Sequence, residues 1–168
     1  MTFDAILLEK IKNLKLVVTD VDGVLTDGSL YYTENGLVMK KFNVKDGMGV
    51  KLLREAGLKT GMISTDTSKF MRLRAERLRM DYIYLGVWEK QVTLREICDD
   101  MNITMAEAAF IGDDVNDLGV MKEAGFTACP ADAVDEIIEI SNYKCKNNGG
   151  RGAYRELVNL ILSIKKEY

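Results

Sequence analysis

Two aspartates spaced two residues apart follow a short apolar run. Asp20 and Asp22 come directly after Leu16–Thr19, and the chain continues as Gly23-Val24-Leu25-Thr26. A β-branched run bounded by a glycine-containing turn is typical of a buried parallel strand, and ligands bind beyond the carboxyl ends of such strands. Two ionised carboxylates placed there repel each other, and a divalent cation would offset their charge. One aspartate is then free to act as a nucleophile on phosphorus.

A second acidic cluster follows another predicted strand. The run Gly112-Asp113-Asp114-Val115-Asn116-Asp117 comes directly after Ala108–Ile111. One of these acids could simply cap the helix that follows, but that role does not account for all of them together with the first pair. Because parallel strands end at the same edge of a sheet, we expect both acidic clusters to meet there. Several acids at one sheet edge indicate a Mg²⁺ site, in which few carboxylates bind the ion and waters remain.

Hydroxyl groups and a lysine follow two further strands. Ser64 and Thr65 come after Leu58–Ile63 and precede a predicted helix. They either cap that helix or hold a phosphate oxygen together with backbone N–H groups. Lys90 follows the strand Tyr82–Leu85 and a glycine turn. It is either a solvated surface charge or a cation that offsets charge on a transferring phosphoryl group.

The elements that must position these groups alternate between strand and helix. Helices are predicted over 1–13, 46–56, 67–79, 89–101, 116–124, 133–138 and 153–165, and strands over 16–19, 58–63, 82–85, 108–111 and 126–129. This alternation predicts an α/β fold, a doubly wound (Rossmann-like) parallel sheet with helices on both faces. Two alternating runs around Glu34-Asn35-Gly36 predict a β-hairpin over 29–42. We predict one domain over 1–168, with the hairpin as a flap and a Gly-rich segment and helix over 149–168.

Composition narrows the possible functions. The 168-residue chain has a net charge of −3 and a pI of about 5.2, which argues against nucleic acid as a partner. It contains no histidine, so a histidine-based triad and a histidine-ligated zinc are excluded. Its three cysteines are widely spaced and show no metal-ligand pattern. Neither a transmembrane-length apolar stretch nor a signal peptide is visible, so we expect a cytoplasmic protein with no membrane partner.

These motifs together resemble those of a known enzyme superfamily. The order Asp20-x-Asp22-Gly23-x-x-Thr26, Ser64, Lys90 and Gly112-Asp113-Asp114-x-x-Asp117 is similar to the four ordered motifs of the haloacid dehalogenase superfamily of phosphotransferases. Within it, the hairpin, Phe42-Asn43-Val44-Lys45-Asp46-Gly47 and Gly149-Gly150-Arg151-Gly152 resemble the capless phosphatases of 3-deoxy-2-ulosonic acid phosphates. The resemblance spans essentially the whole chain and implies a fold without a cap domain.

The resemblance also implies roles for individual residues. Asp20 matches the nucleophile, which becomes an aspartyl phosphate, and Asp22 matches the general acid that protonates the leaving sugar oxygen and then activates water. The Mg²⁺ ligands implied are Asp20, the backbone carbonyl of Asp22, and Asp113. Ser64 and Lys90 match the pair that holds the phosphate. Two further acids, Asp114 and Asp117, match positions that surround the metal or orient the lysine.

The substrate implied is a sugar-acid phosphate with eight or nine carbons, from lipopolysaccharide or sialic acid synthesis. The substrate-binding positions implied are Thr26, Asn43, Asp46, Gly47, Lys51, Thr65, Asp66, Arg74, Arg77 and Lys90. Enzymes acting on eight-carbon octulosonate 8-phosphates carry Gly and Arg where this chain has Thr65 and Asp66. An acid cannot bind a sugar carboxylate as a guanidinium does, which weakens the likeness to the eight-carbon enzymes at this position. Nine-carbon members of the group tend to carry an acid there and a basic residue further along the next helix, here Arg77, so the resemblance favours a nine-carbon nonulosonate 9-phosphate.

Capless members of the superfamily usually assemble as tetramers, and this resemblance implies a homotetramer. The hairpin and the Gly-rich C-terminal segment of a neighbour would then form the lid of each site. Two other classes of protein remain to be weighed. A two-component receiver domain also combines acids, a hydroxyl and a lysine, but its phosphoacceptor lies on a middle strand, where this chain has Ser64. A non-catalytic oligomerisation domain, like the C-terminal domain of animal CMP-sialate synthetase, would tend to lose catalytic acids that are present here.

Overall fold

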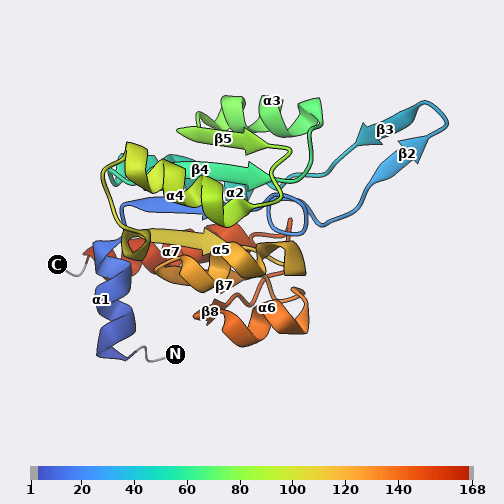
Figure 1. Ribbon diagram of the computed structural model, residues 1–168. Coiled ribbons are helices and arrows are strands. Elements are labelled where there is room, and N and C mark those ends of the chain that lie inside the picture. The colour runs from blue at the N-terminus through green and yellow to red at the C-terminus, as the bar shows by residue number, and fades with distance from the viewer. Residues whose placement is uncertain (1–3, 167–168) are drawn as a thin grey trace.

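A computed structural model of the chain describes residues 4–166 (Figure 1). Its centre is a six-stranded sheet with the order β5-β4-β1-β6-β7-β8, in which every neighbouring pair is parallel. The strands are β1 Leu16–Thr19, β4 Lys59–Ser64, β5 Tyr82–Leu85, β6 Ala108–Ile111, β7 Phe126–Cys129 and β8 Tyr143–Lys144. Because β1 pairs with β4 on one side and β6 on the other, the strand order reverses at β1, which is where doubly wound folds bind ligands.

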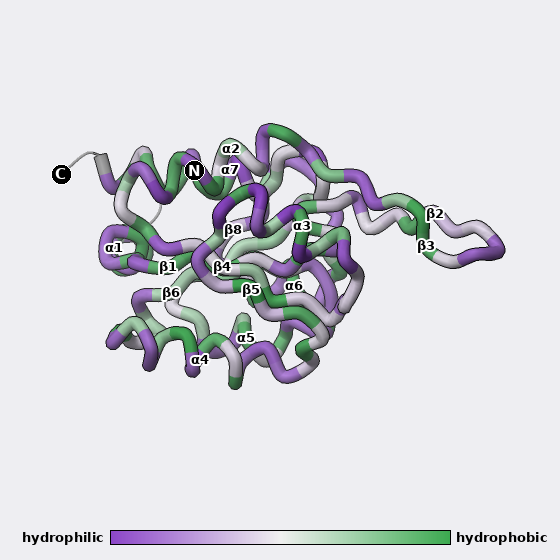
Figure 2. The backbone as a smooth tube through the Cα atoms, turned by 90° about the horizontal axis from the view of Figure 1, so that it is seen from above, coloured by the Kyte–Doolittle hydropathy of each residue, from purple (hydrophilic) through white to green (hydrophobic). Residues whose placement is uncertain are grey.

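Helices cover both faces of this sheet. The helices on one face are α1 Ala5–Asn13, α2 Val44–Glu55 and α7 Ala153–Lys166, and those on the other are α4 Lys90–Asp100, α5 Leu118–Glu123 and α6 Asp135–Ile140. The view from above in Figure 2 separates α2 and α7 from α4 and α5. The helix α3 Lys69–Leu78 packs beside β5 and α2. Two short 3₁₀ helices, η1 Met105–Glu107 and η2 Val115–Asp117, precede β6 and α5.

Strand β1 explains why the sheet needs helices on both sides. All four of its residues are buried, and alternate side chains point to opposite faces. Val17 joins the hydrophobic core beneath α2 and α7, whereas Leu16 and Val18 join the core beneath α4 and α5. The register of β1 is set by its parallel pairing with β4 on one side and β6 on the other, and this pairing places Asp20 at the carboxyl end of the strand.

The hairpin projects from the body of the molecule, as Figure 1 shows. Its strands are β2 Tyr31–Thr33 and β3 Gly36–Met39, which pair only with each other. Five large apolar side chains along it are exposed: Leu30, Tyr31, Tyr32, Val38 and Met39. An isolated two-stranded hairpin is at best marginally stable in water, so this flap is an apolar surface without a covering element in the described chain.

The predicted fold class is confirmed, and element boundaries differ for local reasons. The hairpin strands are shorter than predicted, because the chain turns inward after Met39 and Phe42 bridges to Thr26 instead. Helix α2 begins two residues early, at Val44, because the side chain of Asn43 accepts a hydrogen bond from a backbone N–H in its first turn. The predicted helix over 116–124 is divided into η2 and α5. The first residues of the predicted helix over 1–13 lie outside the described part.

Strand β8 was not predicted, and two contacts explain it. Tyr143 and Lys144 pair with the end of β7, and the side chain of Asn142 accepts a hydrogen bond from the backbone N–H of Thr127. A two-residue edge strand held by such contacts leaves no periodic signal. Within residues 4–166 no cap domain stands over the sheet edge, and no helix there has both the length and the apolar character needed to span a bilayer.

Candidate active site at the carboxyl edge of the sheet

Parallel pairing brings the two predicted acidic clusters together. Thr19 at the end of β1 is the register partner of Ile111 at the end of β6, and the backbone N–H of Asp20 donates to the carbonyl oxygen of Ile111 (2.9 Å). Asp113 follows two residues after Ile111. Carboxylate oxygens of Asp20, Asp113 and Asp117 consequently lie within 4.8 Å of one another.

A buried lysine compensates part of this negative charge. Lys90, the first residue of α4, is fully buried, and its Nζ lies 2.9 Å from Asp20 Oδ1 and 2.6 Å from Asp117 Oδ1. Burial acts to lower the pKa of Lys90, but the charges of Asp20 and Asp117 outweigh it, and the net shift is upward. Lys90 is therefore charged and buried. Its burial excludes the alternative that it is a solvated surface charge.

Asp117 orients this lysine and the neighbouring loop at the same time. Its side chain is fully buried, with Oδ1 accepting from Lys90 and Oδ2 accepting from the backbone N–H of Asp113 (3.0 Å). Asp114 has a different position, because its carboxylate accepts from the N–H of Val115 at the start of η2. Asp117 thus has the lysine-orienting geometry, and Asp114 has the capping geometry.

Within the described residues, Asp113 is the acid of this cluster that has no cation in direct contact, although the charge of Lys90 partly offsets its own. Its Oδ1 is buried and has no hydrogen-bond partner. A Cβ placed on Gly23, whose φ is +86°, would lie 1.8 Å from Asp113 Oδ2, so only glycine allows the loop after β1 to approach so closely. Burial, followed by the charges of Asp20 and Asp117, raises the pKa of Asp113 to about 8. Burial and the charge of Asp117 likewise raise the pKa of Asp20 to about 7, against the opposing effect of Lys90.

This donor set fits a hard divalent cation. The acids offer only oxygen atoms, as Mg²⁺ requires, and the unpaired Oδ1 of Asp113 is an orphaned buried acceptor of the kind that a bound ion satisfies. Of the predicted ligands, Asp20 and Asp113 lie in the cluster. Asp117 is the third acid there, although Lys90 already occupies one of its oxygens.

Asp22 lies at the same edge, with its carboxylate held apart from this cluster. Its Oδ1 accepts a hydrogen bond from the hydroxyl of Thr26 (3.1 Å), and its Oδ2 pairs with Lys40 Nζ (2.6 Å). The hydroxyl of Thr26 is buried and also accepts from the backbone N–H of Gly28 (3.2 Å). Thr26, predicted to bind substrate, therefore shapes the loop and holds Asp22.

An acidic pocket of about 350 Å³ opens over these groups. The residues that line it are Asp20, Asp22, Thr65, Trp88, Asp113, Asp114, Val115 and Asn116. Trp88 and Val115 are exposed at its rim, by 73% and 52%. Ser64 ends β4 and is 1% exposed, and its Oγ accepts from the N–H of Asp66 (3.2 Å). Thr65 is therefore the hydroxyl that the structure presents to the pocket.

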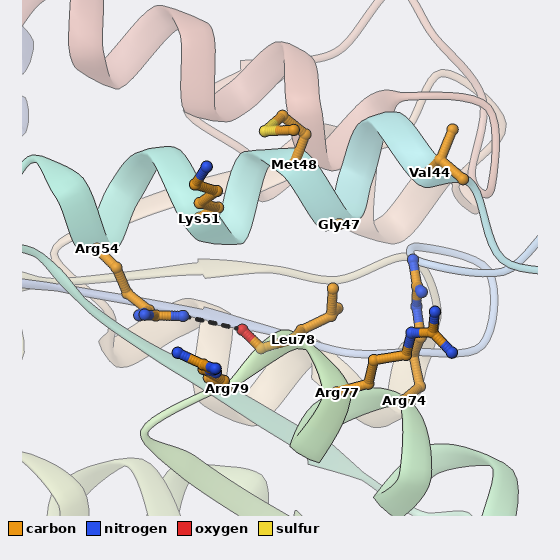
Figure 3. A pocket seen from close by; sticks show the side chains of 9 residues that line it. All are labelled: Val44, Gly47, Met48, Lys51, Arg54, Arg74, Arg77, Leu78 and Arg79. Carbon is orange, nitrogen blue, oxygen red and sulfur yellow. Dashed lines mark hydrogen bonds between the residues drawn. The ribbon is translucent and has the colours of Figure 1, made fainter.

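The predicted basic residues line a second pocket, between α2 and α3 (Figure 3). Its volume is about 490 Å³, and its five cations are Lys51, Arg54, Arg74, Arg77 and Arg79. Arg74 stacks over the ring of Phe42 at 5.4 Å and has a buried Nε without a partner. Burial and the charge of Arg77 lower the pKa of Arg74. The pocket therefore favours an anion, and it shares none of its lining residues with the acidic pocket.

Three other predicted substrate-binding residues lie at junctions between helices. Asn43 caps α2. Asp46 is 1% exposed, and its Oδ1 accepts from the N–H of Arg155 (2.9 Å) near the start of α7, so it links α2 to α7 instead of lying at a surface. Gly47 lines the basic pocket, and a Cβ there would lie 2.8 Å from a guanidinium nitrogen of Arg74.

The Gly-rich C-terminal segment packs against the loop after β1 in the same chain. The N–H of Gly150 donates to the carbonyl oxygen of Val24 (2.9 Å), and a Cβ on Gly149 would lie 1.8 Å from the carbonyl oxygen of Gly23. The predicted lid over a neighbour's site stays a prediction. What this contact provides is support for the backbone that carries Asp22.

Two residues at the site were missed by the sequence analysis. Lys40, which contacts Asp22, directly follows β3, and a lysine at the base of a hairpin gives no signal of burial. Trp88 follows Gly86, whose φ is +76° at the end of β5, and an apolar aromatic residue in such a turn could have indicated a pocket rim. Neither position belongs to the motifs that directed attention to the acids.

The fold and this arrangement are those of a hydrolase superfamily. Residues 68–157 match the family of haloacid dehalogenase-like hydrolases, and the chain belongs to that family. The 3-deoxy-D-manno-octulosonate 8-phosphate phosphatase of Haemophilus influenzae is 36% identical over 157 residues, which cover 94% of this chain and 87% of the relative.

Solved structures give the same result. The cobalt-bound form of the Haemophilus influenzae phosphatase superposes with a TM-score of 0.90 at 36% identity and covers 94% of this chain and 92% of that one. The Moraxella catarrhalis 3-deoxy-D-manno-octulosonate 8-phosphate phosphatase, in complex with magnesium, phosphate and KDO, superposes with a TM-score of 0.92 at 33% identity, covering 96% and 92%.

The incompletely compensated charge of Asp113 should destabilise the metal-free protein. The folded carboxyl keeps its proton up to about pH 8, whereas the unfolded one loses it near 3.8, so the wild type loses stability as pH rises through that window. We expect Asp113→Asn to raise the Tm of the metal-free protein near pH 8, by roughly 2–4 °C for each kcal/mol gained in a domain of this size, and by progressively less toward pH 4.

Mg²⁺ should reverse the order of the two Tm values, so that the wild type becomes more stable than Asp113→Asn. It should raise the Tm of the wild type through binding to the folded state and raise that of Asp113→Asn much less, as measured by thermal unfolding with Mg²⁺ and with EDTA. Asp114→Asn is the matched control and should keep the wild-type response. Equal Mg²⁺ shifts in wild type and Asp113→Asn would contradict the assignment.

Proposed function

We propose that this protein is a Mg²⁺-dependent phosphatase that hydrolyses the terminal phosphate of a 3-deoxy-2-ulosonic acid phosphate, with 3-deoxy-D-manno-octulosonate 8-phosphate as the preferred substrate. The observation that carries the proposal is the buried cluster in which Lys90 pairs with Asp20 and Asp117 beside the unpaired oxygen of Asp113. A non-catalytic oligomerisation domain has no need for this cluster, because buried charges of this kind are costly to keep.

In the first chemical step Asp20 is the nucleophile. Lys90 occupies its Oδ1, which leaves Oδ2 to form the bond to phosphorus while the bond from phosphorus to the sugar oxygen breaks. Asp22 gives its proton to that departing oxygen, so the sugar acid leaves as an alcohol. The products of this step are an aspartyl phosphate on Asp20 and the free sugar acid.

In the second step water hydrolyses the aspartyl phosphate. Asp22, now a carboxylate, takes a proton from the attacking water, whose oxygen bonds to phosphorus as the bond to Asp20 breaks. Inorganic phosphate leaves, and Asp22 regains the proton needed for the next cycle. Mg²⁺, held by Asp20, Asp113 and the backbone carbonyl of Asp22, would supply positive charge to the phosphoryl oxygens. Lys90 and Thr65, whose side chain lines the acidic pocket, would hold the same phosphoryl group, and the phosphate-holding role of Ser64 stays a prediction.

Two sugar-acid phosphates are candidate substrates, one with eight carbons and one with nine. The relatives that support the proposal are named for an octulosonate 8-phosphate, whereas the acid at position 66 favours a nine-carbon substrate. In the structure both oxygens of Asp66 already have partners, Lys40 and the N–H of Ser68. An occupied carboxylate is a poor discriminator of sugars, so Asp66 gives little support to a nine-carbon substrate, and the relatives then favour the eight-carbon one. The nine-carbon substrate stays a prediction.

The carboxylate of the sugar acid needs a cation, and the basic pocket supplies it. Lys51, Arg74 and Arg77 line that pocket, and Arg74 has an unpaired buried Nε. Charge-assisted hydrogen bonds from a guanidinium are well suited to a carboxylate. We assign the carboxylate subsite to these three residues.

The protein assembles as a homotetramer in the cytoplasm, and the hairpin is the contact between subunits. Its exposed apolar side chains, among them Tyr32 and Val38, would be covered by a neighbouring subunit. A hairpin that reaches a neighbour would also shield that neighbour's pocket from water, which strengthens electrostatic interactions inside it.

The first test is phosphate release with Mg²⁺ on octulosonate 8-phosphate, two nonulosonate 9-phosphates and ordinary hexose phosphates. We expect the highest kcat/KM for the 8-phosphate and loss of activity with EDTA. Preference for a 9-phosphate would overturn the substrate, and no release from any of them would favour the non-catalytic domain. Asp20→Asn should lower kcat by ~10³-fold or more with an unchanged circular dichroism spectrum.

The carboxylate subsite is tested with a substrate that has no carboxylate. Arg74→Leu should raise KM for the sugar-acid phosphate by about 10-fold, because a charge-assisted hydrogen bond is lost, and should leave KM for p-nitrophenyl phosphate unchanged. Arg72→Leu, on the exposed side of α3 and outside the basic pocket, is the matched control. An equal rise for both substrates would show that Arg74 acts on the fold alone.

The subunit contact is tested by solution mass. The wild type should sediment as four chains of 18.9 kDa, and the double variant Tyr32→Asp with Val38→Asp should sediment as a smaller species, because two charges enter an apolar contact. Leu73→Asp places a charge on an exposed apolar residue of α3 and should leave the mass unchanged. A tetramer in the double variant would exclude the hairpin as the contact.

A further inference from the structure

Lys40 is a buried cation that joins two acids from distant parts of the chain. It is the first residue after β3, and its side chain is 1% exposed. Its Nζ lies 2.6 Å from Asp22 Oδ2 and also pairs with Asp66, which follows β4. Burying an ammonium group is costly unless it is paired, so both contacts are needed to keep it there.

Asp66 is itself fixed, which makes it an anchor for the lysine. One of its oxygens pairs with Lys40, and the other accepts from the backbone N–H of Ser68 ahead of α3. The backbone N–H of Asp66 donates to the hydroxyl of Ser64. The lysine is thus held from the side of β4, independently of Asp22.

The carboxylate of Asp22 is restrained at both oxygens. Lys40 holds Oδ2, and the hydroxyl of Thr26 holds Oδ1 at 3.1 Å. Thr26 belongs to the same loop as Asp22, so its hydrogen bond ties the carboxylate to its own loop. Lys40 is the side chain from outside that loop that contacts Asp22.

The same lysine connects Asp22 to the hairpin. Lys40 follows β3 directly, and Phe42 two residues later bridges to Thr26. The flap is otherwise a free two-stranded hairpin within the described residues. A shift of its base would therefore move Lys40 and withdraw one of the two restraints on Asp22.

We propose that Lys40, anchored by Asp66, is a positioning residue that holds Asp22 for proton transfer and couples its orientation to the hairpin. The proposal rests on the proposed function, in which Asp22 gives its proton to the departing oxygen. It also gives Asp66 a role that does not involve contact with the substrate.

The test compares substrates whose leaving groups differ in whether they need a proton from Asp22. An alkoxide such as a sugar oxygen leaves only when protonated, whereas p-nitrophenolate leaves without a proton. We expect Lys40→Met to lower kcat/KM for the sugar-acid phosphate and for phenyl phosphate by ~10- to 100-fold, because misplaced general acids lose much of their effect. For p-nitrophenyl phosphate the loss should be less than about threefold. The quantity kcat/KM reports only the first step, so the later role of Asp22 does not enter.

Matched variants separate positioning from folding. Lys41→Met removes the neighbouring lysine, which is half exposed and pairs with Asp27, and should behave as wild type on every substrate. Lys40→Arg keeps the cation and should restore part of the loss. Asp66→Asn should reproduce the leaving-group dependence of Lys40→Met and lower activity on 8- and 9-phosphates by the same factor. If Lys40→Met does not fold, Asp66→Asn decides the question.

Each outcome is interpretable. Equal losses on phenyl and p-nitrophenyl phosphate would assign Lys40 a purely structural role and overturn the proposal. A changed ratio between 8- and 9-phosphates in Asp66→Asn would make Asp66 a specificity residue and overturn its anchoring role. If the wild type fails on the sugar acids but hydrolyses aryl phosphates through Asp20, the proposed substrate is wrong, and the aryl series still tests Lys40.

Discussion

The pairing of Lys90 with Asp20 and Asp117 is the interaction on which the rest of the site depends. Three carboxylates within 4.8 Å cannot all be ionised in a buried place without compensation. The lysine supplies one positive charge at the first turn of α4, and Asp117 in turn holds the backbone of Asp113. Parallel pairing of β1 with β6 brings the acids together, and the lysine makes their proximity sustainable.

The one positive charge of Lys90 does not balance the three carboxylates, and the remaining negative charge creates a site for a cation. After Lys90 is paired, Asp113 keeps a buried oxygen without a partner, and its raised pKa reflects the same imbalance. A protein selected only for stability would replace this acid with a neutral or apolar residue. Because Asp113 is kept, and because neighbouring side chains cannot move to pair with its oxygen, the cluster can bind a hard cation more tightly than water-exposed acids could.

Sequence analysis predicted those features that depend on local pattern. Strands such as β1 are recognisable because both faces are buried, and the spacing of Asp20 from Asp113 across two motifs survives any error in helix boundaries. Contacts between segments that are distant in the sequence could not be predicted in this way. Asp46 begins the helix predicted over 46–56 and matches a substrate-binding position, yet it is buried because α7 begins against it. Lys40 reads as a surface residue of a strand, yet two acids draw it inward. In both cases a partner on another element decides the outcome.

Asp66 illustrates why such pairs matter when a substrate is assigned from sequence. Taken alone, an acid in place of an arginine indicates a different sugar, because the two side chains recognise opposite charges. In the folded chain the side chain facing position 66 is Lys40, 26 residues earlier in the sequence. An arginine at 66 would place two cations together, so it would have to turn away from Lys40, toward solvent or ligand, whereas an aspartate is drawn to the lysine. Residue 66 can therefore contact substrate in one relative and anchor a lysine beside Asp22 in another. A substrate can be inferred from the residue at position 66 only when the residue at position 40 is considered with it.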